Sequence, residues 1–389
     1  MNRSVKGPLA VVLALGVVLL AAAPADAKRR APFGFFGTSL DGLISVSDLD
    51  RSNQGQLMVR SGVESIRVNF AWDAAQPTSG PPRFGGTDAT VRFAAQHGLS
   101  VLPLVMYTPR WASSNPSAPN YMLYAPTDPN TYGAFLTALI RRYGPTGTFW
   151  AENPGLPRIP IRDWQIWNEP AFRYFWATPD YPRSYPRLLK VAYRAVHAAD
   201  RHARVVMAGL ASFNTTGASW TDLKRFYRHG VRRYYDVLAI HPFSWNLNRV
   251  IRTIQLNRKV QRRYHDSRKP IYLTELSWPA SKGRIPPSLY LGFEVTPRRQ
   301  RRLLAAAYAR LIRDRRLHVR RAFWYTWAST YSPVSCEGTA VSFQYSGLLR
   351  RTCGPGTSFS STRLLSTYAR TARRYEGCRK GSSARSCRR

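Results

Sequence analysis

Apolar runs of strand length alternate with amphipathic segments of helical period along almost the whole chain, and this alternation limits the fold more than any other feature. We count eight such units in the 389 residues. The expected strands are 33–40, 63–70, 99–107, 161–167, 204–210, 236–241, 270–275 and 321–327. The expected helices are 50–62, 87–97, 131–143, 185–201, 220–229, 249–265, 296–321 and 363–375.

This pattern predicts a parallel sheet covered by helices. Strands that alternate with helices pair in parallel, and nearly continuous apolar strands are buried on both faces. Eight units favour a single closed (β/α)8 TIM barrel, an α/β fold, over residues 28–375, with an insertion at 144–160 between the third and fourth strands. An open doubly wound sheet is the alternative, but no glycine-rich phosphate-binding motif follows the first strand.

Two of the expected strands lead directly to a carboxylate. Strand 161–167 is followed by Asn168, Glu169 and Pro170, and a proline cannot donate to a sheet. Glu169 alone could simply cap the next segment. However, the segment 270–278 has the same form, with Glu275 at the end of its apolar run. In a closed barrel both ends open on the face that carries the active sites of barrel enzymes, and paired carboxylates are what glycoside hydrolysis needs.

These motifs carry a resemblance to a known group of enzymes. Asn-Glu-Pro at 168–170, with a second glutamate after Tyr-Leu-Thr at 272–274, resembles the clan A retaining glycoside hydrolases, which are (β/α)8 barrels. The chain is most similar to families five (cellulase-like) and thirty-nine (xylosidase-like), over essentially the whole mature sequence. The resemblance implies that Glu169 is the acid/base and Glu275 the nucleophile. The implied activity is cleavage of O-glycosyl bonds in a β-linked oligo- or polysaccharide.

The chemistry sets a requirement for each carboxylate. A retaining mechanism needs the two carboxyls ~5–5.5 Å apart, one protonated and one ionised. Glu275 must be ionised to attack the sugar, whereas Glu169 must keep its proton near neutral pH, which burial and a neighbouring negative charge can arrange. Asn168 is expected to donate a hydrogen bond to the sugar 2-hydroxyl. The sequence suggests no metal ion or cofactor.

Two polar residues at other strand ends are further candidates for the substrate site. By resemblance, Arg67 bonds the nucleophile and would keep Glu275 ionised, although a surface arginine is the alternative. His241 ends the sixth strand, where a structural histidine is the alternative. Similar enzymes often carry a tyrosine two residues after this histidine. Here that residue is Phe243, which has no hydroxyl to offer Glu275.

Tryptophans follow several strand ends. Trp327 ends the eighth strand, where the resemblance implies an aromatic floor under the sugar. Other tryptophans near strand ends are either walls of a cleft or ordinary core: Trp72, Trp111, Trp176, Trp245 and Trp278.

The N-terminal sequence predicts export. Arg3 and Lys6 precede an apolar run at 9–23, and Ala-Asp-Ala at 25–27 has the form of a cleavage site. This run is shorter than the ~20 residues of a membrane span. We therefore expect a signal peptide at 1–27 and a secreted or extracellular protein, with an uncleaved anchor as the alternative.

The cysteines agree with that expectation. There are four, at Cys336, Cys353, Cys378 and Cys387, and an even number in an exported chain suggests disulfides. Nearest-neighbour pairing is one of three possibilities. Zinc binding is disfavoured because the spacings are wide and no histidines accompany them. Residues 376–389 form a basic tail that contains the last two cysteines.

The chain is strongly basic, with 58 lysines and arginines against 21 acidic residues and a net charge of +37. Such a field favours anionic partners, such as acidic glycans or cell-wall polymers. The arginines are dispersed, however, as is usual for the outer faces of helices. Besides a glycosidase, the sequence allows an inactive carbohydrate-binding barrel or a basic surface protein. The absence of a recognised nucleic-acid-binding module disfavours nucleic acid.

Overall fold

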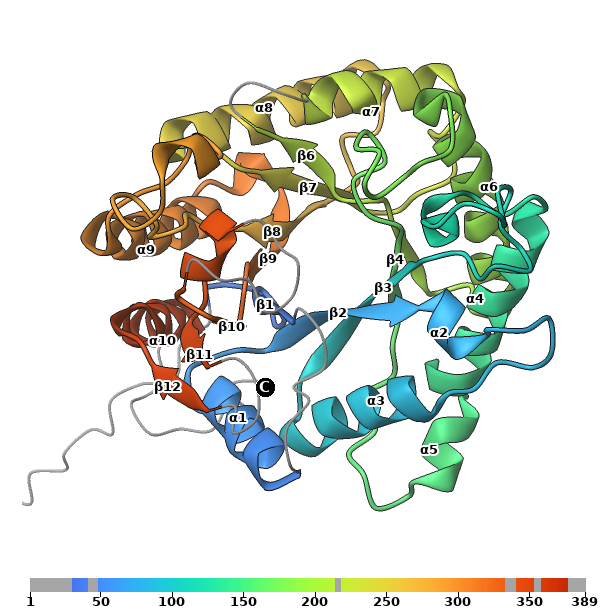
Figure 1. Ribbon diagram of the computed structural model, residues 1–389, viewed down its shortest axis with the longest axis horizontal. Helices are drawn as coiled ribbons and strands as arrows, with labels where there is room; N and C mark the ends of the chain where they lie inside the picture. The colour runs from blue at the N-terminus through green and yellow to red at the C-terminus, as the bar shows by residue number, and fades with distance from the viewer. Residues whose placement is uncertain (1–29, 41–47, 214–217, 333–340, 353–357, 377–389) are drawn as a thin grey trace, which may run out of the picture.

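The strands form one parallel sheet that curls into a barrel (Figure 1). The computed structural model describes residues 30–40, 48–213, 218–332, 341–352 and 358–376. Its strands are β1 Phe36–Leu40, β2 Ser65–Ala71, β3 Ser100–Met106, β4 Asp163–Ile166, β5 Arg204–Val206, β6 Leu210–Ser212, β7 Leu238–Pro242, β8 Ile271–Leu276 and β9 Val319–Trp324. They pair in parallel in the order β5-β4-β3-β2-β1-β9-β8-β7-β6. The expected α/β barrel is confirmed.

The predicted fifth strand, 204–210, is two short strands in the structure. β5 pairs with β4, whereas β6 pairs with β7. Between them the N–H of Met207 donates to the carbonyl of Val237 at 2.9 Å, and Val206 and Val237 form a parallel bridge. β5 and β6 are consecutive pieces of one segment, so together they complete the wall of the barrel.

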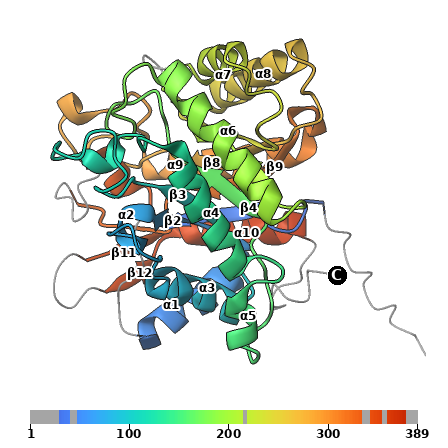
Figure 2. The ribbon, with the colours of Figure 1, turned by 90° about the vertical axis from the view of Figure 1, so that its right-hand side faces the viewer.

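Helices surround the sheet, as Figures 1 and 2 show. The long ones are α1 Asp48–Arg60, α3 Gly85–His97, α4 Pro129–Tyr143, α6 Tyr181–Ala199, α7 Ser219–Arg228, α8 Leu247–Arg263, α9 Pro297–Arg313 and α10 Arg363–Glu376. Local sequence sets where they begin. Asp128 accepts the N–H of Asn130 at the start of α4, Thr296 accepts that of Arg299 at the start of α9, and each helix has proline as its first residue.

The arginine-rich helix is shorter in the structure than the predicted range 296–321. The structure ends α9 at Arg313, and a short 3-10 turn at Arg315–Leu317 follows before β9 begins at Val319. Asp314 explains the break, because its carboxylate accepts the N–H of Arg316 and caps the new turn. The last strand therefore begins two residues earlier than predicted and ends at Trp324, so Trp327 lies beyond it.

Two short helices and a small sheet were not predicted. The insertion at 144–160 contains a helix, α5 Thr148–Glu152, and α2 Trp72–Ala75 follows β2. A three-stranded sheet lies between β9 and α10. Its strands are β10 Ala328–Ser329, β11 Leu349–Arg351 and β12 Phe359–Ser361, with β11 in the middle.

The first and last described segments meet. The N–H groups of Arg30 and Ala31 both donate to the carbonyl of Tyr375 in α10, at 2.9 and 3.2 Å. The predicted signal peptide and all four cysteines lie outside the described residues, as does the basic tail after Glu376. Within the described ranges, no helix is long and apolar enough to cross a membrane.

Candidate active site

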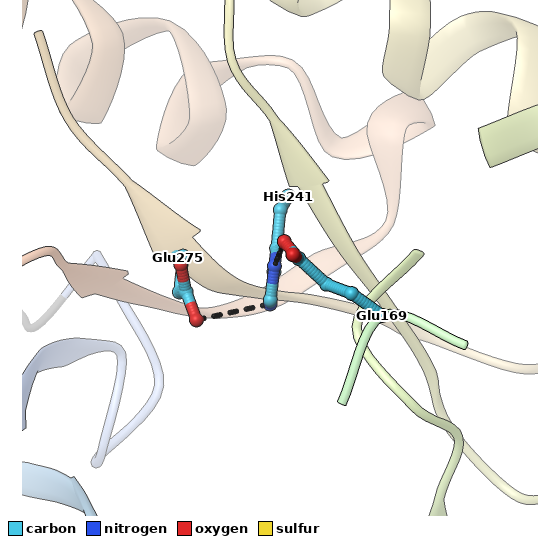
Figure 3. Close-up of side chains that lie close together, drawn as sticks. All are labelled: Glu169, His241 and Glu275. Atoms are coloured by element: carbon cyan, nitrogen blue, oxygen red, sulfur yellow. Dashed lines mark hydrogen bonds and ion pairs between the residues drawn. The ribbon is translucent and has the colours of Figure 1, made fainter. Parts of the chain in front are cut away.

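The two glutamates singled out in the sequence lie together at one end of the barrel (Figure 3). Glu169 follows β4 and Glu275 lies near the end of β8, with 4% and 9% of their surfaces exposed. A carboxylate oxygen of Glu169 lies within 4.8 Å of one of Glu275. Both strands run in the same direction, so both side chains are delivered to the carboxyl-end face of the sheet.

The backbone is strained where β4 releases Glu169. Trp167 and Glu169 have positive φ angles of 67° and 36°, a region that costs residues other than glycine about 1–3 kcal/mol. Surrounding contacts hold this turn in place. The Trp167 amide donates to the carbonyl of Val105, its indole N–H donates to the carbonyl of Phe175, and Asn168 bridges to Gly209. The strained turn aims Glu169 across the barrel mouth.

Arg67 holds three residues of the site at once. Its guanidinium donates to Glu275 Oε1 at 2.8 Å, to Asn168 Oδ1 at 2.8 Å and to Gln165 Oε1 at 2.7 Å. The side chain is 5% exposed, so these are bonds to a buried cation. The structure therefore places the predicted Arg67 beside Glu275, and it also bonds Arg67 to Asn168.

His241 lies between the two carboxylates (Figure 3). Its Nδ1 is 2.5 Å from Glu169 Oε1, and its Nε2 is 2.9 Å from the hydroxyl of Thr274 and 3.7 Å from Glu275 Oε1. The ring is fully buried. The backbone of Gly209 passes so close to the imidazole that a Cβ at that position would overlap it. Only a glycine therefore leaves room for His241 in this position.

These contacts form one chain of hydrogen bonds from Arg67 to Glu169. Arg67 donates to Gln165 Oε1, and Gln165 Nε2 donates to Thr274 Oγ1 at 3.4 Å. We assign the Thr274 hydroxyl as donor to His241 Nε2, and Nδ1–H as donor to Glu169 Oε1. The second oxygen of Glu169 is then free of this chain and can carry a proton.

Electrostatics separate the two carboxylates. Burial, and after it the charge of Glu275, raises the pKa of Glu169 well above its usual value. Burial also raises the pKa of Glu275, but Arg67 opposes that shift through its charge and its hydrogen bond. The proton of the pair therefore resides on Glu169. Burial and the nearby Arg67 lower the pKa of His241 well below 6.5, so the imidazole is neutral.

Among the described residues, Glu169, His241 and Glu275 are also the one group of three side chains with the donor atoms and spacing of a metal site. Those atoms are already engaged by Arg67, Thr274 and one another. The guanidinium at 2.8 Å from Glu275 disfavours a second cation there.

An aromatic row beside His241 was missed by sequence reasoning. It consists of five rings from segments that follow successive strands, with the centres of neighbouring rings less than 6 Å apart: Phe172, Phe213, Phe243, Phe293 and Phe343. Phe243, the residue in place of the expected tyrosine, is buried in the middle of the row. Because most of these rings lie outside the strands and long helices, no periodic sequence pattern predicts their positions.

Tyr174 was also missed, and it extends the aromatic row. It is 59% exposed and stacks on Phe172, with ring centres 5.3 Å apart. Partial burial, and then the charges of Glu169 and Glu275, raise the pKa of the Tyr174 hydroxyl. This loop residue therefore brings a hydroxyl and an aromatic face into the electrostatic field of both carboxylates.

Trp327 is not brought to the carboxylates by any described contact. It is 1% exposed, and its indole N–H donates to Gln54 of α1 at 3.0 Å. Its role as a sugar platform stays a prediction. Of the other tryptophans, Trp72, Trp176 and Trp278 are core residues, whereas Trp111 and Trp245 have exposed faces.

Comparison with solved structures shows that the fold of this chain is similar to the folds of several glycoside hydrolases. A family 39 glycoside hydrolase from Bacteroides cellulosilyticus WH2 aligns with TM-score 0.61 at 19% identity, over 88% of this chain and 64% of that one. A glucosidase from Croceicoccus marinus gives 0.61 at 15% identity, over 90% of this chain and 68% of that one. A family 5 enzyme of subfamily 18 from Bifidobacterium longum, solved with Manβ1-4GlcNAc, gives 0.61 at 16% identity, over 89% and 78%.

The sequence by itself finds no such relatives. No family model matches it, and no curated protein does. At identities this low, the structural matches establish a shared fold and nothing more. Families five and thirty-nine, which the motifs resemble, are both represented among the solved structures that share it.

Proposed function

We propose that this protein is a retaining glycoside hydrolase that cleaves a β-linked oligo- or polysaccharide. The observation that carries the proposal is the carboxylate pair. Glu169 and Glu275 are buried at strand ends, with oxygens within 4.8 Å of each other. A separation of ~5–5.5 Å between carboxyls is typical of retaining enzymes, whereas inverting enzymes need ~6.5–9.5 Å to admit a water molecule.

In the first step Glu275 is the nucleophile. Its carboxylate attacks the anomeric carbon while Glu169 gives its proton to the glycosidic oxygen, and the bond between that carbon and the oxygen breaks. Arg67 keeps Glu275 ionised and aimed through the bond at 2.8 Å. The proton leaves from the Glu169 oxygen that His241 does not contact.

In the second step Glu169 changes role. Once Glu275 is esterified, its negative charge is gone, and the pKa of Glu169 falls because that charge was one cause of its elevation. Glu169 can then take a proton from water as the water oxygen attacks the sugar and releases Glu275. His241 Nδ1–H bonds the same Glu169 oxygen throughout, so the carboxyl keeps its orientation.

Asn168 and the aromatic rings suit the binding of sugar. Arg67 fixes Asn168 Oδ1, which leaves the amide NH2 to donate to a 2-hydroxyl. Tyr174 offers an exposed ring that stacks on Phe172, and aromatic faces stack on sugar rings. The signal-like sequence at the N-terminus supports a secreted enzyme that meets its substrate outside the cell.

The roles are tested by separating the two carboxylates. Glu275→Gln removes the nucleophile, so no glycosyl-enzyme should form with any substrate. Glu169→Ala should still react with an activated aryl β-glycoside, whose leaving group needs no acid, and a covalent intermediate should accumulate on Glu275. Azide needs no base, so it should rescue this variant and give a β-glycosyl azide.

A screen over aryl β-glycosides and β-linked polysaccharides supplies the substrate, and NMR of the product supplies its stereochemistry. Inverted product from the wild type, or an α-azide from the Glu169 variant, would refute the assignment. Tight sugar binding without turnover of any substrate would instead indicate an inactive barrel that only binds carbohydrate.

A further inference from the structure

A cavity lined by none of the residues around the carboxylate pair lies at the rim of the same end of the barrel. Its volume is about 310 Å³. It lies where the segments after β8 and β9 meet the first turns of α9 and α10, which are close together in Figure 1. Segments that follow the carboxyl ends of barrel strands lie on the active-site face, and loops after the seventh and eighth barrel strands often bind phosphate in such folds.

Four arginines line this cavity: Arg284, Arg301, Arg350 and Arg363. None of its lining residues is acidic. The ion pairs among the described residues involve other arginines, and none includes these four. Four guanidinium groups around one cavity repel one another, so an anion bound between them would relieve that repulsion.

Two of these arginines are held in place by aromatic rings rather than by carboxylates. The guanidinium of Arg350 lies 5.3 Å from the ring centre of Tyr331, and that of Arg284 lies 5.7 Å from the ring centre of Tyr345. Tyr331 is itself fixed, since its hydroxyl donates to the carbonyl of Gly347 at 2.5 Å. Stacking leaves the N–H groups at the edge of a guanidinium available to a ligand.

Hydroxyl side chains form one further part of the wall, which suits a hydroxylated ligand. Ser360, Ser361 and Thr362 line the side formed by β12 and the start of α10. The Thr362 hydroxyl accepts the N–H groups of Leu364 and Leu365, both at 3.2 Å, and so caps α10. The positive end of that helix adds to the field of the arginines.

We propose that this cavity binds an acidic saccharide unit, a sugar ring that carries sulfate, phosphate or carboxylate. The arginine forks match such oxyanions, and the hydroxyl-lined wall matches the polyol. A volume of this size can hold a sugar ring with its charged group, more than a single inorganic ion requires. This inference deepens the proposed glycosidase, because an enzyme with such a subsite on its active-site face would act on acidic glycans.

The test measures binding rather than turnover, so its result does not depend on whether the protein is an active glycosidase. The probes are a sulfated dextran oligosaccharide, the unsulfated oligosaccharide of the same length, inorganic phosphate and single-stranded DNA, all measured by calorimetry. The pocket variant is Arg284→Ala with Arg350→Ala. The matched control is Arg302→Ala with Arg313→Ala, which removes the same charge from exposed positions on α9 outside the cavity.

We expect the wild type to bind the sulfated oligosaccharide and to ignore the neutral one. The pocket variant should lose about tenfold or more in affinity, and the control pair about threefold or less, because only the pocket variant removes direct charge-assisted hydrogen bonds. Arg284→Lys with Arg350→Lys, which keeps the charge but loses the fork, should give an intermediate loss. A melting temperature for each variant verifies that it folds.

Equal losses in the pocket and control variants would overturn the proposal, because they would mean attraction by the net charge alone. Inorganic phosphate bound as tightly as the sulfated sugar, or DNA bound more tightly through the same arginines, would overturn the saccharide assignment. Binding that persists while every glycoside substrate fails would leave the subsite standing and refute only the catalytic proposal.

Discussion

At the residue scale, the site works as a connected set rather than as a pair of carboxylates. Arg67 bonds Glu275 directly and reaches Glu169 through Gln165, Thr274 and His241. The same cation therefore influences Glu275 at close range and, through this chain, the orientation of Glu169 at long range. Because every link is buried, loss of one partner leaves another polar group without a bond.

The raised pKa of Glu169 makes a prediction about stability. A carboxyl whose pKa is higher in the folded than in the unfolded state adds to the stability of the fold at low pH. This added stability is lost as pH rises from the unfolded pKa, near 4.5, through the folded pKa. Glu169→Gln replaces this ionisable carboxyl with an amide that stays neutral at every pH. It should therefore be more stable than the wild type at neutral pH, and the difference should shrink as pH falls toward the unfolded value near 4.5 and vanish below it.

Urea unfolding across this pH range measures the effect, and Glu152 gives a control of opposite sign. Its hydrogen bond to Arg142 lowers the pKa of that exposed carboxyl. Stability from this pair is present above the unfolded pKa and lost at low pH, so Glu152→Gln should cost a little stability at neutral pH. A Glu169→Gln protein less stable than the wild type at pH 7 would contradict the protonated state assigned here.

At the scale of elements, the broken fifth strand is what makes room for the site. β5 pairs with β4 as far as Val206, and β6 pairs with β7 from Leu210 onward. Gly209 lies between these two strands, against the ring of His241. A continuous strand with a side chain at that position would push the imidazole away from Glu169. The change of partner strand is thus tied to the position of Glu169.

Gly209→Ala should displace His241 and reduce kcat strongly while the fold survives. Misplacing a catalytic group by about 1 Å can cost on the order of 100-fold in rate. Steady-state kinetics on an aryl glycoside and a circular dichroism spectrum make the measurement. Gly155→Ala is the matched control, because nothing lies within 4 Å of a Cβ there. Full activity in the Gly209 variant would mean that the ring position does not matter.

Much of the fold and half of the site could be predicted at this scale. Long apolar strands predicted the barrel, and strand-end positions brought Asn168, Glu169, His241 and Glu275 together, because carboxyl ends of parallel strands share one face. Arg67 was predicted from the resemblance, and the structure places it inside β2 rather than at its end. The strands of the small sheet are two or three residues long, too short for any period. Phe172, Tyr174 and Phe343 lie outside the strands, where only tertiary contacts decide position.

At the scale of the whole molecule, the net charge of +37 is a cost as well as a possible means of recruitment. Arginines on the outer helices repel one another, since too few carboxylates exist to pair them. Sodium chloride screens such repulsion, with a Debye length that falls from ~30 Å at 0.01 M to ~10 Å at 0.1 M.

The melting temperature should therefore rise when sodium chloride is added to a low-salt buffer, most of all over the first ~0.1 M. A thermal melt followed by circular dichroism at constant pH measures this rise. Chloride is the appropriate anion, since sulfate could also bind the arginine cavity and stabilise the protein by mass action. A melting temperature that falls with added chloride would show that attractive ion pairs dominate over repulsion.

The contact of Arg30 and Ala31 with Tyr375 has a consequence for engineering. Hydrogen bonds join the first and last described segments, so Arg30 and Tyr375 lie close together in space. A short peptide could link Glu376 to Arg30, and new ends could be cut at Gly155, in an exposed part of the insertion. Such circular permutation keeps every strand pairing and both glutamates in place. Gly155 and the joined segments precede strands, so they lie at the amino-end face of the sheet, and a domain fused at the new ends would leave the opposite face with the two glutamates open.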